Sequence, residues 1–521
     1  MGRWCPTAAA RQTTAPARRA GGRRQGRRQG RRGERSGGRR VAALIDNAVL
    51  EYEDAIDHKP AGGVTDPAPR PPAPGVPALS RYPVPTPRPP VGARAGAGVR
   101  ARARAWTGKL LARRIQKRGI DLSSLTFIPE RTKVPLQRDG IDPVPRLAEL
   151  RDQDPVHRLK LPFAFSVYLV TGAEHVRAVL ADRDSWSNDI RHLLPGAGPS
   201  SAEEVGGLGF TDPPLHTRLR KIITPEFTMR RLARLEPMIE TIVAERLDAL
   251  AATGSPADLA RLVSFPVPFQ TICALLGLEL EDRDAFARLG VQRFDATAGA
   301  AAAFGAVSAQ REFLFDAVAR QRAEPGPGLI GQIIRDEGDR ISDVDLAGLA
   351  DGVFTGGYET TAGMISLSTM VLLRDPAHAA LVRDGSRADV DRVVEELLRH
   401  LSVVQLAFPR FARHDLDLFG VPLKAGDVVL ASLSGANRDP RSAGDQPETF
   451  DPLRRPVSGH LAFGHGIHRC IGAELARMEL RVVLPALLRR FPDLALAVPQ
   501  RELSFRELSF VYGLDELPVR F

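Results

Sequence analysis

One short segment near the C-terminal end constrains the fold of this chain more than any other. Residues 463–472 read FGHGIHRCIG, which places Cys470 after a glycine-rich loop and directly before a helix-periodic stretch at about 471–490. Gly464, Gly466 and Gly472 allow positive φ, or a close approach of the backbone to a flat group, where a Cβ atom would clash. The chain must therefore fold so that this loop holds one cysteine at the start of a helix.

The position of this cysteine is typical of a metal ligand. Unpaired backbone N–H groups and the helix dipole at a helix N-terminus favour the thiolate and lower the pKa of the thiol. A thiolate is one of the axial ligands of heme iron, where it donates electron density that favours O–O cleavage. Most free cysteines are ordinary buried residues, but the spacing F-x-x-G-x-x-x-C-x-G is too specific for that alternative. We predict that Cys470 ligates heme iron and that Phe463, Gly464 and Gly472 shape its loop.

A second motif, TGGYETT at 355–361, interrupts a stretch that is otherwise helical at about 343–374. Two glycines inside a helix cost roughly 1 kcal/mol each relative to alanine, so they need a reason. We expect Gly356 and Gly357 to leave room for heme and dioxygen against the helix. Glu359 and Thr360 form an acid–alcohol pair, in which Thr360 would hydrogen-bond dioxygen and Glu359 would relay protons from solvent. For the motif alone, a helix irregularity with surface side chains is the alternative.

Four further side chains are candidates to neutralise the two carboxylates of a heme. His216 and Arg220 stand four residues apart and share a helix face, and Arg410 and His468 add two donors. Arginine binds carboxylates in a bidentate manner, which suits this role. Each of the four, taken alone, could be an ordinary surface residue.

Glu396 and Arg399 form a pair of opposite charge three residues apart on a predicted helix. An isolated pair of this kind is usually a solvated surface salt bridge. Its position about 70 residues before the cysteine segment makes it more informative about the fold than an isolated pair would be. Together these residues resemble the soluble bacterial cytochrome P-450 family of heme-thiolate monooxygenases over about 120–521. The segments that carry the resemblance are 463–472, 356–361, the Glu396/Arg399 pair, the helix start at 212–216, and the stretches 436–440 and 447–451.

The resemblance implies a mainly α (α+β) fold, rich in helices with small β-sheets. The heme would lie between the oxygen-activation helix and the helix that follows the cysteine loop. Glu396 and Arg399 would then be buried and, through Arg454, would hold the core beneath the heme to the segment before the cysteine loop. The family correspondence also places a set of apolar residues near the substrate pocket, although any one of them could be a core residue: Phe354, Leu406, Phe408, Phe510 and Val511.

By the same resemblance the reaction is the insertion of one oxygen atom from O2 into a C–H bond or across a C=C bond of a hydrophobic small molecule. Hydroxylation and epoxidation both stay open, and so does the choice between a free and a carrier-bound substrate. Relatives often oxidise secondary metabolites such as polyketides, macrolides, terpenoids or peptides. Two departures from the family pattern, Gly356 for alanine and Tyr358 for histidine, concern the pocket or the proton path rather than the reaction class.

The implied cofactor is heme b, with O2 as co-substrate. We find no flavin or iron–sulfur motif, so we expect electrons from NAD(P)H to arrive through a ferredoxin reductase and a ferredoxin. An acidic ferredoxin could dock on the thiolate face, where Arg469, Arg218 and Lys221 supply positive charge.

Three alternatives differ in class. A peroxygenase or a nitric oxide reductase with a heme-thiolate centre usually lacks the acid–alcohol pair that Glu359 and Thr360 form here. A heme-binding sensor without enzymatic activity would need no proton relay and would carry an output domain. An enzyme tethered to nucleic acid would use the basic leader described next.

Residues 1–119 form a leader outside the resemblance. Residues 1–120 contain 26 Lys and Arg against 7 Asp and Glu, whereas 121–521 contain 46 against 55. The overall charge of +10 therefore says nothing about nucleic-acid binding by the remainder, and we do not expect such binding. The leader is rich in Arg, Pro, Gly and Ala, so we expect it to be disordered, or to reflect a misassigned start. Three scattered cysteines and no apolar run of about 20 residues favour a cytoplasmic monomer without a membrane anchor.

Overall fold

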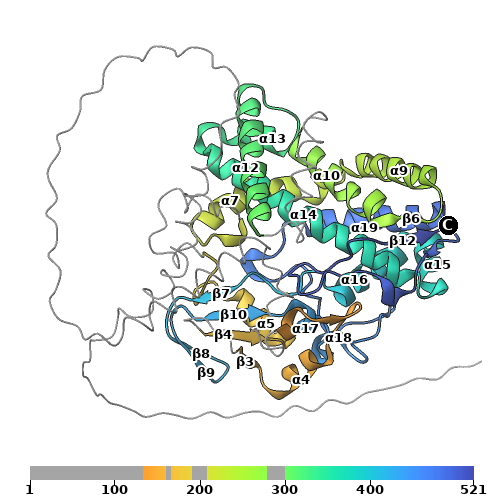
Figure 1. Ribbon diagram of the computed structural model, residues 1–521. Helices are drawn as coiled ribbons and strands as arrows, with labels where there is room; N and C mark the ends of the chain where they lie inside the picture. Colours follow the sequence, from red (N-terminus) through yellow and green to blue (C-terminus); the bar gives the residue numbers. More distant parts are fainter. Residues whose placement is uncertain (1–132, 160–165, 190–207, 279–299) are drawn as a thin grey trace, which may run out of the picture. The chain divides into compact units, whose positions relative to one another are not determined.

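The structure is a computed structural model of the chain, and it describes residues 133–159, 166–189, 208–278 and 300–521 (Figure 1). The leader predicted for residues 1–119 lies outside these ranges. The described residues form mainly helices together with small sheets, which confirms the predicted fold class.

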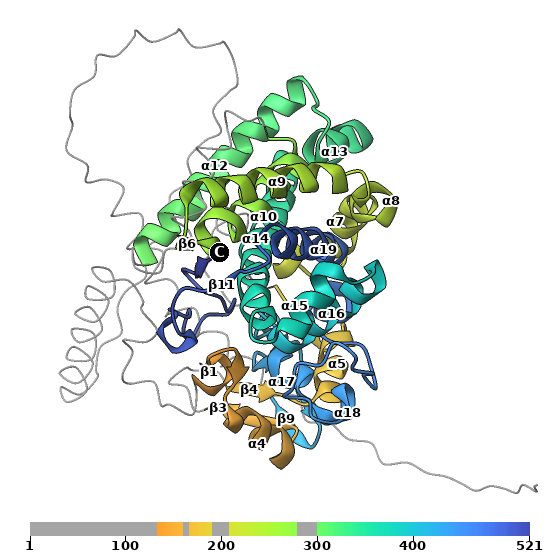
Figure 2. The ribbon, with the colours of Figure 1, turned by 90° about the vertical axis from the view of Figure 1, so that its right-hand side faces the viewer.

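One long helix, α14 (Asp343–Leu372), is the element against which much of the helical part packs (Figures 1 and 2). Its first turn is capped by Ser342, whose hydroxyl accepts a hydrogen bond from the backbone N–H of Asp345 at 3.1 Å. Every residue from 361 to 372 is buried, and several helices pack against α14 as a whole. Because this half of α14 is buried all round, its sequence lacks the polar face that a surface helix carries. Three of the packed helices are α10 (Pro266–Leu276), α12 (Ala300–Ala323) and α19 (Ala473–Arg490).

Helix α16 (Arg387–Leu401) shows how local sequence fixes a helix start. The Ser386 hydroxyl accepts from the Asp389 backbone N–H, and the Asp389 carboxylate accepts from the Ser386 N–H. This reciprocal capping box satisfies two donors that the helix leaves unpaired. The other helices are α4 (Pro145–Gln153), α5 (Ala173–Ala181), α7 (Leu215–Ile223), α8 (Met229–Leu232), α9 (Glu236–Thr253), α13 (Leu329–Glu337), α15 (Pro376–Asp384), α17 (Leu433–Asn437) and α18 (Pro440–Ala443).

The largest sheet among the described strands has five strands in the order β3-β4-β10-β7-β5. Only the β10–β4 pair is parallel, and it joins segments about 260 residues apart in the sequence. The strands of this sheet are β3 (Val156–Leu159), β4 (Val167–Val170), β5 (Trp186–Ser187), β7 (Arg410–Ala412) and β10 (Val428–Ala431). The smaller sheets contain β1 (Arg138–Asp139), β2 (Asp142–Pro143), β6 (Ala257–Asp258), β8 (Leu416–Leu418), β9 (Val421–Leu423), β11 (Ala495–Leu496) and β12 (Pro518–Arg520).

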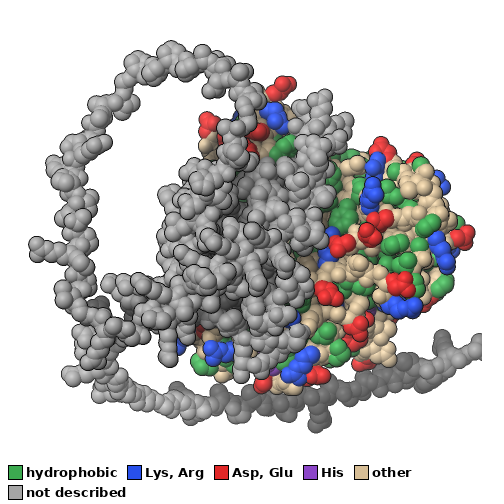
Figure 3. All heavy atoms as spheres, viewed as in Figure 1, with side chains coloured by type: hydrophobic (Ala, Val, Ile, Leu, Met, Phe, Trp, Pro, Cys, Tyr) green, Lys and Arg blue, Asp and Glu red, His purple; other side chains and the backbone are tan. Residues whose placement is uncertain are grey.

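Two features concern the helices as possible membrane spans and the distribution of charge on the surface. Within the described ranges, no helix combines the length and the apolar character that crossing a membrane requires. On the face that Figure 3 shows, positive and negative side chains are interspersed rather than gathered by sign.

One acidic side chain is buried inside this helical core. Glu479 lies on α19 with 1% of its surface exposed, and its Oε2 has no hydrogen-bond partner among the described residues. Desolvation raises the pKa of this carboxyl from 4.5 to about 8. In the folded protein Glu479 therefore holds a proton at pH values where the unfolded chain has lost it.

We predict that this carboxyl makes stability depend on pH. Because its folded pKa lies above its unfolded value, the free energy of unfolding should fall as pH rises from about 4.5 to about 8. The fall attributable to Glu479 should reach roughly 3 kcal/mol at pH 7. Glu479→Gln should remove that slope in urea unfolding followed by circular dichroism. Glu474→Gln on the same helix, whose carboxylate already pairs with Arg477, is the control and should keep the slope. An unchanged slope in Glu479→Gln would contradict the prediction.

Candidate active site

The cysteine loop is held by its own backbone and by a neighbouring helix. The N–H of Cys470 donates to the carbonyl of Phe463 at 2.9 Å, which closes the loop just before α19. Gly464 and Gly466 have φ values of +68° and +72°. A Cβ atom on Gly466 would lie 2.1 Å from the carbonyl oxygen of Leu180 at the end of α5. Gly466 therefore serves both the turn and the close contact with α5.

The surroundings of the Cys470 sulfur differ from the sequence-based prediction. The side chain is accessible to solvent, yet the protein around it desolvates the thiol and raises its pKa. The backbone N–H of Gly472 and the charge of Arg220 act in the opposite direction but do not outweigh desolvation. The backbone N–H at the helix start does lower this pKa, as we expected, but the sequence did not reveal the desolvation that raises it by more. A bound metal ion would reverse the balance, because coordination deprotonates a thiol.

Two histidines lie together beside this loop. His216 on α7 and His468 in the short 3-10 turn Gly466–His468 have ring centroids 4.2 Å apart. Nε2 of His216 and Nδ1 of His468 are buried and have no partner among the described residues. Desolvation, followed by the charges of His216 and Arg410, lowers the pKa of His468 to about 3. Both rings are therefore neutral near pH 7, and each presents a ring nitrogen that is not used inside the protein.

Arg410 on β7 adds a buried positive charge to the same region. It is 4% exposed, and its Nη1 donates to the Phe408 carbonyl at 2.9 Å. Across the described part of the chain it has no carboxylate within ion-pair distance, and desolvation lowers its pKa to about 10 despite the charge of Asp212. Buried cations and donors without partners are costly. Together with His216 and His468, Arg410 therefore provides a donor set that fits the two carboxylates of a heme. Arg220, the fourth predicted anchor, is half-buried on α7 and interacts electrostatically with Cys470.

The two glycines of α14 have different surroundings. A Cβ atom on Gly356 would meet nothing within 4 Å, so this position faces open space. A Cβ atom on Gly357 would lie 2.2 Å from Cδ1 of Ile272, so this glycine allows α10 to pack closely. The open space predicted for both glycines is thus present only at Gly356. The hydroxyl of Thr360 donates to the Gly356 carbonyl at 2.6 Å.

Glu359 makes an ion pair that the sequence analysis did not anticipate. Its carboxylate accepts a hydrogen bond from the guanidinium of Arg506. Arg506 also donates from Nε to the Asp515 carboxylate at 2.6 Å. The pair joins residues 147 positions apart, and no local pattern around Arg506 marks it.

The second predicted pair, Glu396 and Arg399, is buried and bidentate. Nε and Nη2 of Arg399 each donate to the Glu396 carboxylate at 2.7 Å, and the side chains are 4% and 6% exposed. Arg454 donates to the same carboxylate at 3.1 Å. Because both side chains are buried, Glu396 and Arg399 do not form a solvated surface pair.

Arg399 and Arg454 also donate hydrogen bonds to backbone carbonyls that precede the cysteine loop in the sequence. Arg399 donates to the carbonyls of Asn437, Pro447 and Thr449. The Asn437 side chain in turn accepts from the Leu461 N–H at 2.6 Å, two residues before the loop begins. The network therefore connects α16 to the start of the cysteine loop.

The predicted pocket residues divide into two groups. Phe354 is fully buried in an aromatic cluster with Phe269 and Tyr358, and Leu406 is 4% exposed in a core cluster near the five-stranded sheet. Both residues therefore pack inside the protein core. Phe408 and Phe510 are 48% and 51% exposed. Val511 is half-buried and forms a β-bridge with Val404.

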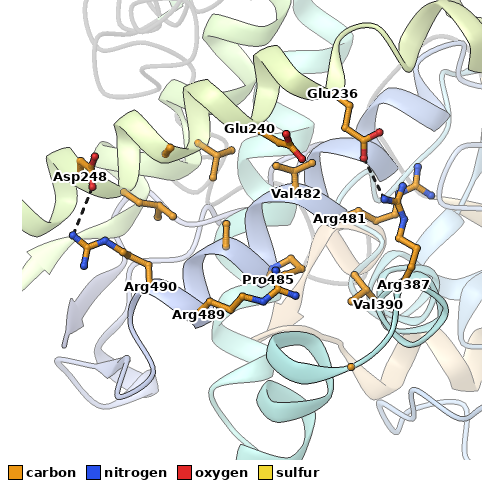
Figure 4. A pocket seen from close by; sticks show the side chains of 15 residues that line it. Glu236, Glu240, Asp248, Arg387, Val390, Arg481, Val482, Pro485, Arg489 and Arg490 are labelled. Atoms are coloured by element: carbon orange, nitrogen blue, oxygen red, sulfur yellow. Dashed lines mark hydrogen bonds and ion pairs between the residues drawn. The ribbon is translucent and has the colours of Figure 1, made fainter.

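A cavity of about 640 Å³ lies between α9, α16 and α19 (Figure 4). Val243, Leu247 and Val482 are among the apolar residues that line it, and the ion pair Arg490–Asp248 also belongs to its lining. None of the residues predicted for the site lines this cavity, so we do not assign it to the site around Cys470.

Known proteins resemble this chain in sequence over most of its length. A family model described as Cytochrome P450 matches residues 389–508. Cytochrome P450 FAS1 of Rhodococcoides fascians is 40% identical over 389 residues, which cover 73% of this chain and 96% of the relative. Mycinamicin IV hydroxylase/epoxidase of Micromonospora griseorubida is 37% identical and covers 73% of this chain and 96% of its own length.

Solved structures give the same result. P450 StaH from biosynthesis of the glycopeptide antibiotic A47934 superposes with a TM-score of 0.68 at 40% identity, covering 74% of this chain and 99% of that structure. OxyC, a cytochrome P450 implicated in oxidative C–C coupling during vancomycin biosynthesis, superposes with a TM-score of 0.67 at 40% identity. It covers 74% of this chain and 96% of its own chain.

We predict that the Glu396 network is essential for stability. Glu396→Gln would leave two buried arginines without their shared carboxylate, and removing one partner of a buried ion pair typically costs about 3–5 kcal/mol. The expected result is an equally large drop in the free energy of unfolding in urea, or failure to accumulate folded protein. Glu149→Gln is the control, because this carboxylate pairs with Arg146 at the surface, where the two side chains are 49% and 56% exposed, and its loss should cost no more than about 1 kcal/mol. Equal urea midpoints for the two variants would refute the prediction.

Proposed function

Because the chain belongs to the cytochrome P450 family of monooxygenases, which use heme and O2, we propose that Cys470 is the ligand of its heme iron. The observation that carries this proposal is the convergence of the Cys470 loop with the unpartnered ring nitrogens of His216 and His468 and with the buried guanidinium of Arg410. These three residues, with Arg220, would hold the heme carboxylates. When bound, the heme supplies the iron that activates dioxygen.

Residues of α14 would transfer the protons that the reaction consumes. Gly356 leaves open space beside α14, and the Thr360 hydroxyl lies one helical turn further along. Glu359 would take up a proton from solvent at its carboxylate, and Thr360 would pass a proton through Oγ1 towards the reacting dioxygen. We propose residues 120–521 as the segment that performs this reaction.

For the substrate, we propose a hydrophobic secondary metabolite that is hydroxylated or epoxidised. The exposed aromatic rings of Phe408 and Phe510 support an apolar binding surface. The name of the mycinamicin relative describes both reactions, which also supports the proposal. A second candidate is oxidative coupling within a glycopeptide precursor, because OxyC is implicated in an oxidative C–C coupling reaction and StaH comes from biosynthesis of a glycopeptide antibiotic.

Electrons would come from NAD(P)H through a ferredoxin reductase and a ferredoxin. Arg469 and Lys221 are exposed near the thiolate side and could attract an acidic partner. Arg218 is less suitable than we expected from the sequence, because it already pairs with Asp345 of α14.

Replacement of Cys470 tests the thiolate assignment. Cys470→Ser removes the sulfur at the end of the loop, so the absorption spectrum of the reduced carbon monoxide complex should lose its thiolate signature, and O2-dependent turnover should stop. Cys273→Ala, at a buried cysteine of α10, is the control and should leave both readouts unchanged. A thiolate signature that persists in Cys470→Ser would overturn the proposed ligand.

Replacement of Thr360 tests whether the enzyme is a monooxygenase with an active proton path or a peroxygenase. With a substrate identified by its shift of the heme absorption band, Thr360→Ala should lower product per NAD(P)H severalfold and release hydrogen peroxide. Thr369→Ala is a close control, because its hydroxyl also donates to the carbonyl four residues earlier. Full coupling in Thr360→Ala would show that Thr360 is not needed for proton delivery, and product formation with hydrogen peroxide but not with NAD(P)H and O2 would favour the peroxygenase alternative.

A further inference from the structure

We infer that Arg506 is a positioning residue that holds the proton-relay acid Glu359 and ties it to the C-terminal hairpin at 505–514. The inference rests on the role proposed for Glu359. Arg506 contacts Glu359 with Nη1 and Asp515 with Nε, so one guanidinium fixes two carboxylates. The side chains of Arg506 and Glu359 are 17% and 13% exposed, whereas that of Asp515 is 60% exposed.

The backbone of the hairpin fixes the position of Arg506. The N–H of Arg506 donates to the carbonyl of Gly513 at 3.0 Å, and Phe505 forms a bridge with Leu514. The rings of Phe505 and Tyr512 stack with centroids 5.7 Å apart. Arg506 therefore extends from an ordered base, which lowers the entropy cost of its contact with Glu359.

The same hairpin touches α14 and carries a candidate pocket residue. A Cβ atom on Gly363, one turn beyond Thr360, would lie 3.0 Å from the Tyr512 carbonyl oxygen. At the tip, the carbonyl of Phe510 accepts from the Gln405 N–H at 3.0 Å, while its ring is exposed. The ring that could touch a substrate and the arginine that holds Glu359 thus belong to one short hydrogen-bonded unit.

This connection has a chemical consequence for proton delivery. The charge of Arg506 favours the ionised form of the Glu359 carboxylate, so Glu359 accepts a proton most easily when the contact loosens. When it leaves Arg506, the Glu359 carboxylate takes up a proton from solvent, passes a proton on towards Thr360, and returns to Arg506 as a carboxylate. Displacement of the hairpin by a bound substrate would shift this exchange, so proton delivery would respond to occupancy of the pocket.

Arg506→Gln tests the inference in turnover. Product formed per NAD(P)H should fall severalfold, with a matching rise in hydrogen peroxide, whereas Arg506→Lys should restore part of the coupling because it keeps the charge. Turnover driven by added hydrogen peroxide should persist in Arg506→Gln, because peroxide brings both oxygen and protons. Arg501→Gln removes an 81% exposed arginine of the same segment and should couple as the wild type does.

A second measurement needs neither turnover nor heme. If Glu359 and Arg506 act as a pair, the urea midpoint of the double variant Glu359→Gln/Arg506→Gln should lie close to that of either single variant. Hydrogen exchange at 505–514 should accelerate in Glu359→Gln. Additive losses of the urea midpoint, together with wild-type coupling in Arg506→Gln, would overturn the inference. A wild-type protein that forms no product from O2 would instead contradict the proposed function.

Discussion

The carboxylate of Glu396 is the constraint on which the site depends. It accepts hydrogen bonds from Arg399 and Arg454, and Arg399 continues to three backbone carbonyls. One of these belongs to Asn437, whose side chain accepts from the backbone just before the cysteine loop. A buried ion pair of this kind seldom adds much net stability over an apolar core, but it penalises any arrangement that breaks it. Its contribution is therefore to specify where the backbone leading to Cys470 lies.

Several groups around the proposed heme site are energetically unfavourable when the protein is considered alone. Desolvation disfavours both the Cys470 thiolate and the charged form of Arg410, and His216 and His468 each carry a buried ring nitrogen without a partner among the described residues. Each of these features costs free energy in the protein alone. A ligand that combines a metal ion with two carboxylates offsets all of them together, so folding and cofactor binding should be strongly linked.

The sequence could predict those features that depend on nearby residues. The glycine motif around Cys470 and the mid-helix motif around Thr360 each span no more than about ten residues. Helices α19 and α14 occupy nearly the residue ranges that the sequence predicts. Features that depend on packing were not predictable in this way. The Glu359–Arg506 pair spans 147 residues, the burial of Phe354 needs α10 beside α14, and the raised pKa of Cys470 reflects its surroundings rather than its helix.

The two glycines of α14 show how neighbouring positions can be free to change to different degrees. Any larger residue at Gly357 would meet Cδ1 of Ile272, so the Ile272 side chain on α10 would have to move to make room for it. Gly356 meets no such neighbour, and alanine at this point would even favour the helix by roughly 1 kcal/mol. The volume beside the proposed reacting centre can therefore vary during evolution, one methyl group at a time, without disturbing the scaffold that surrounds it.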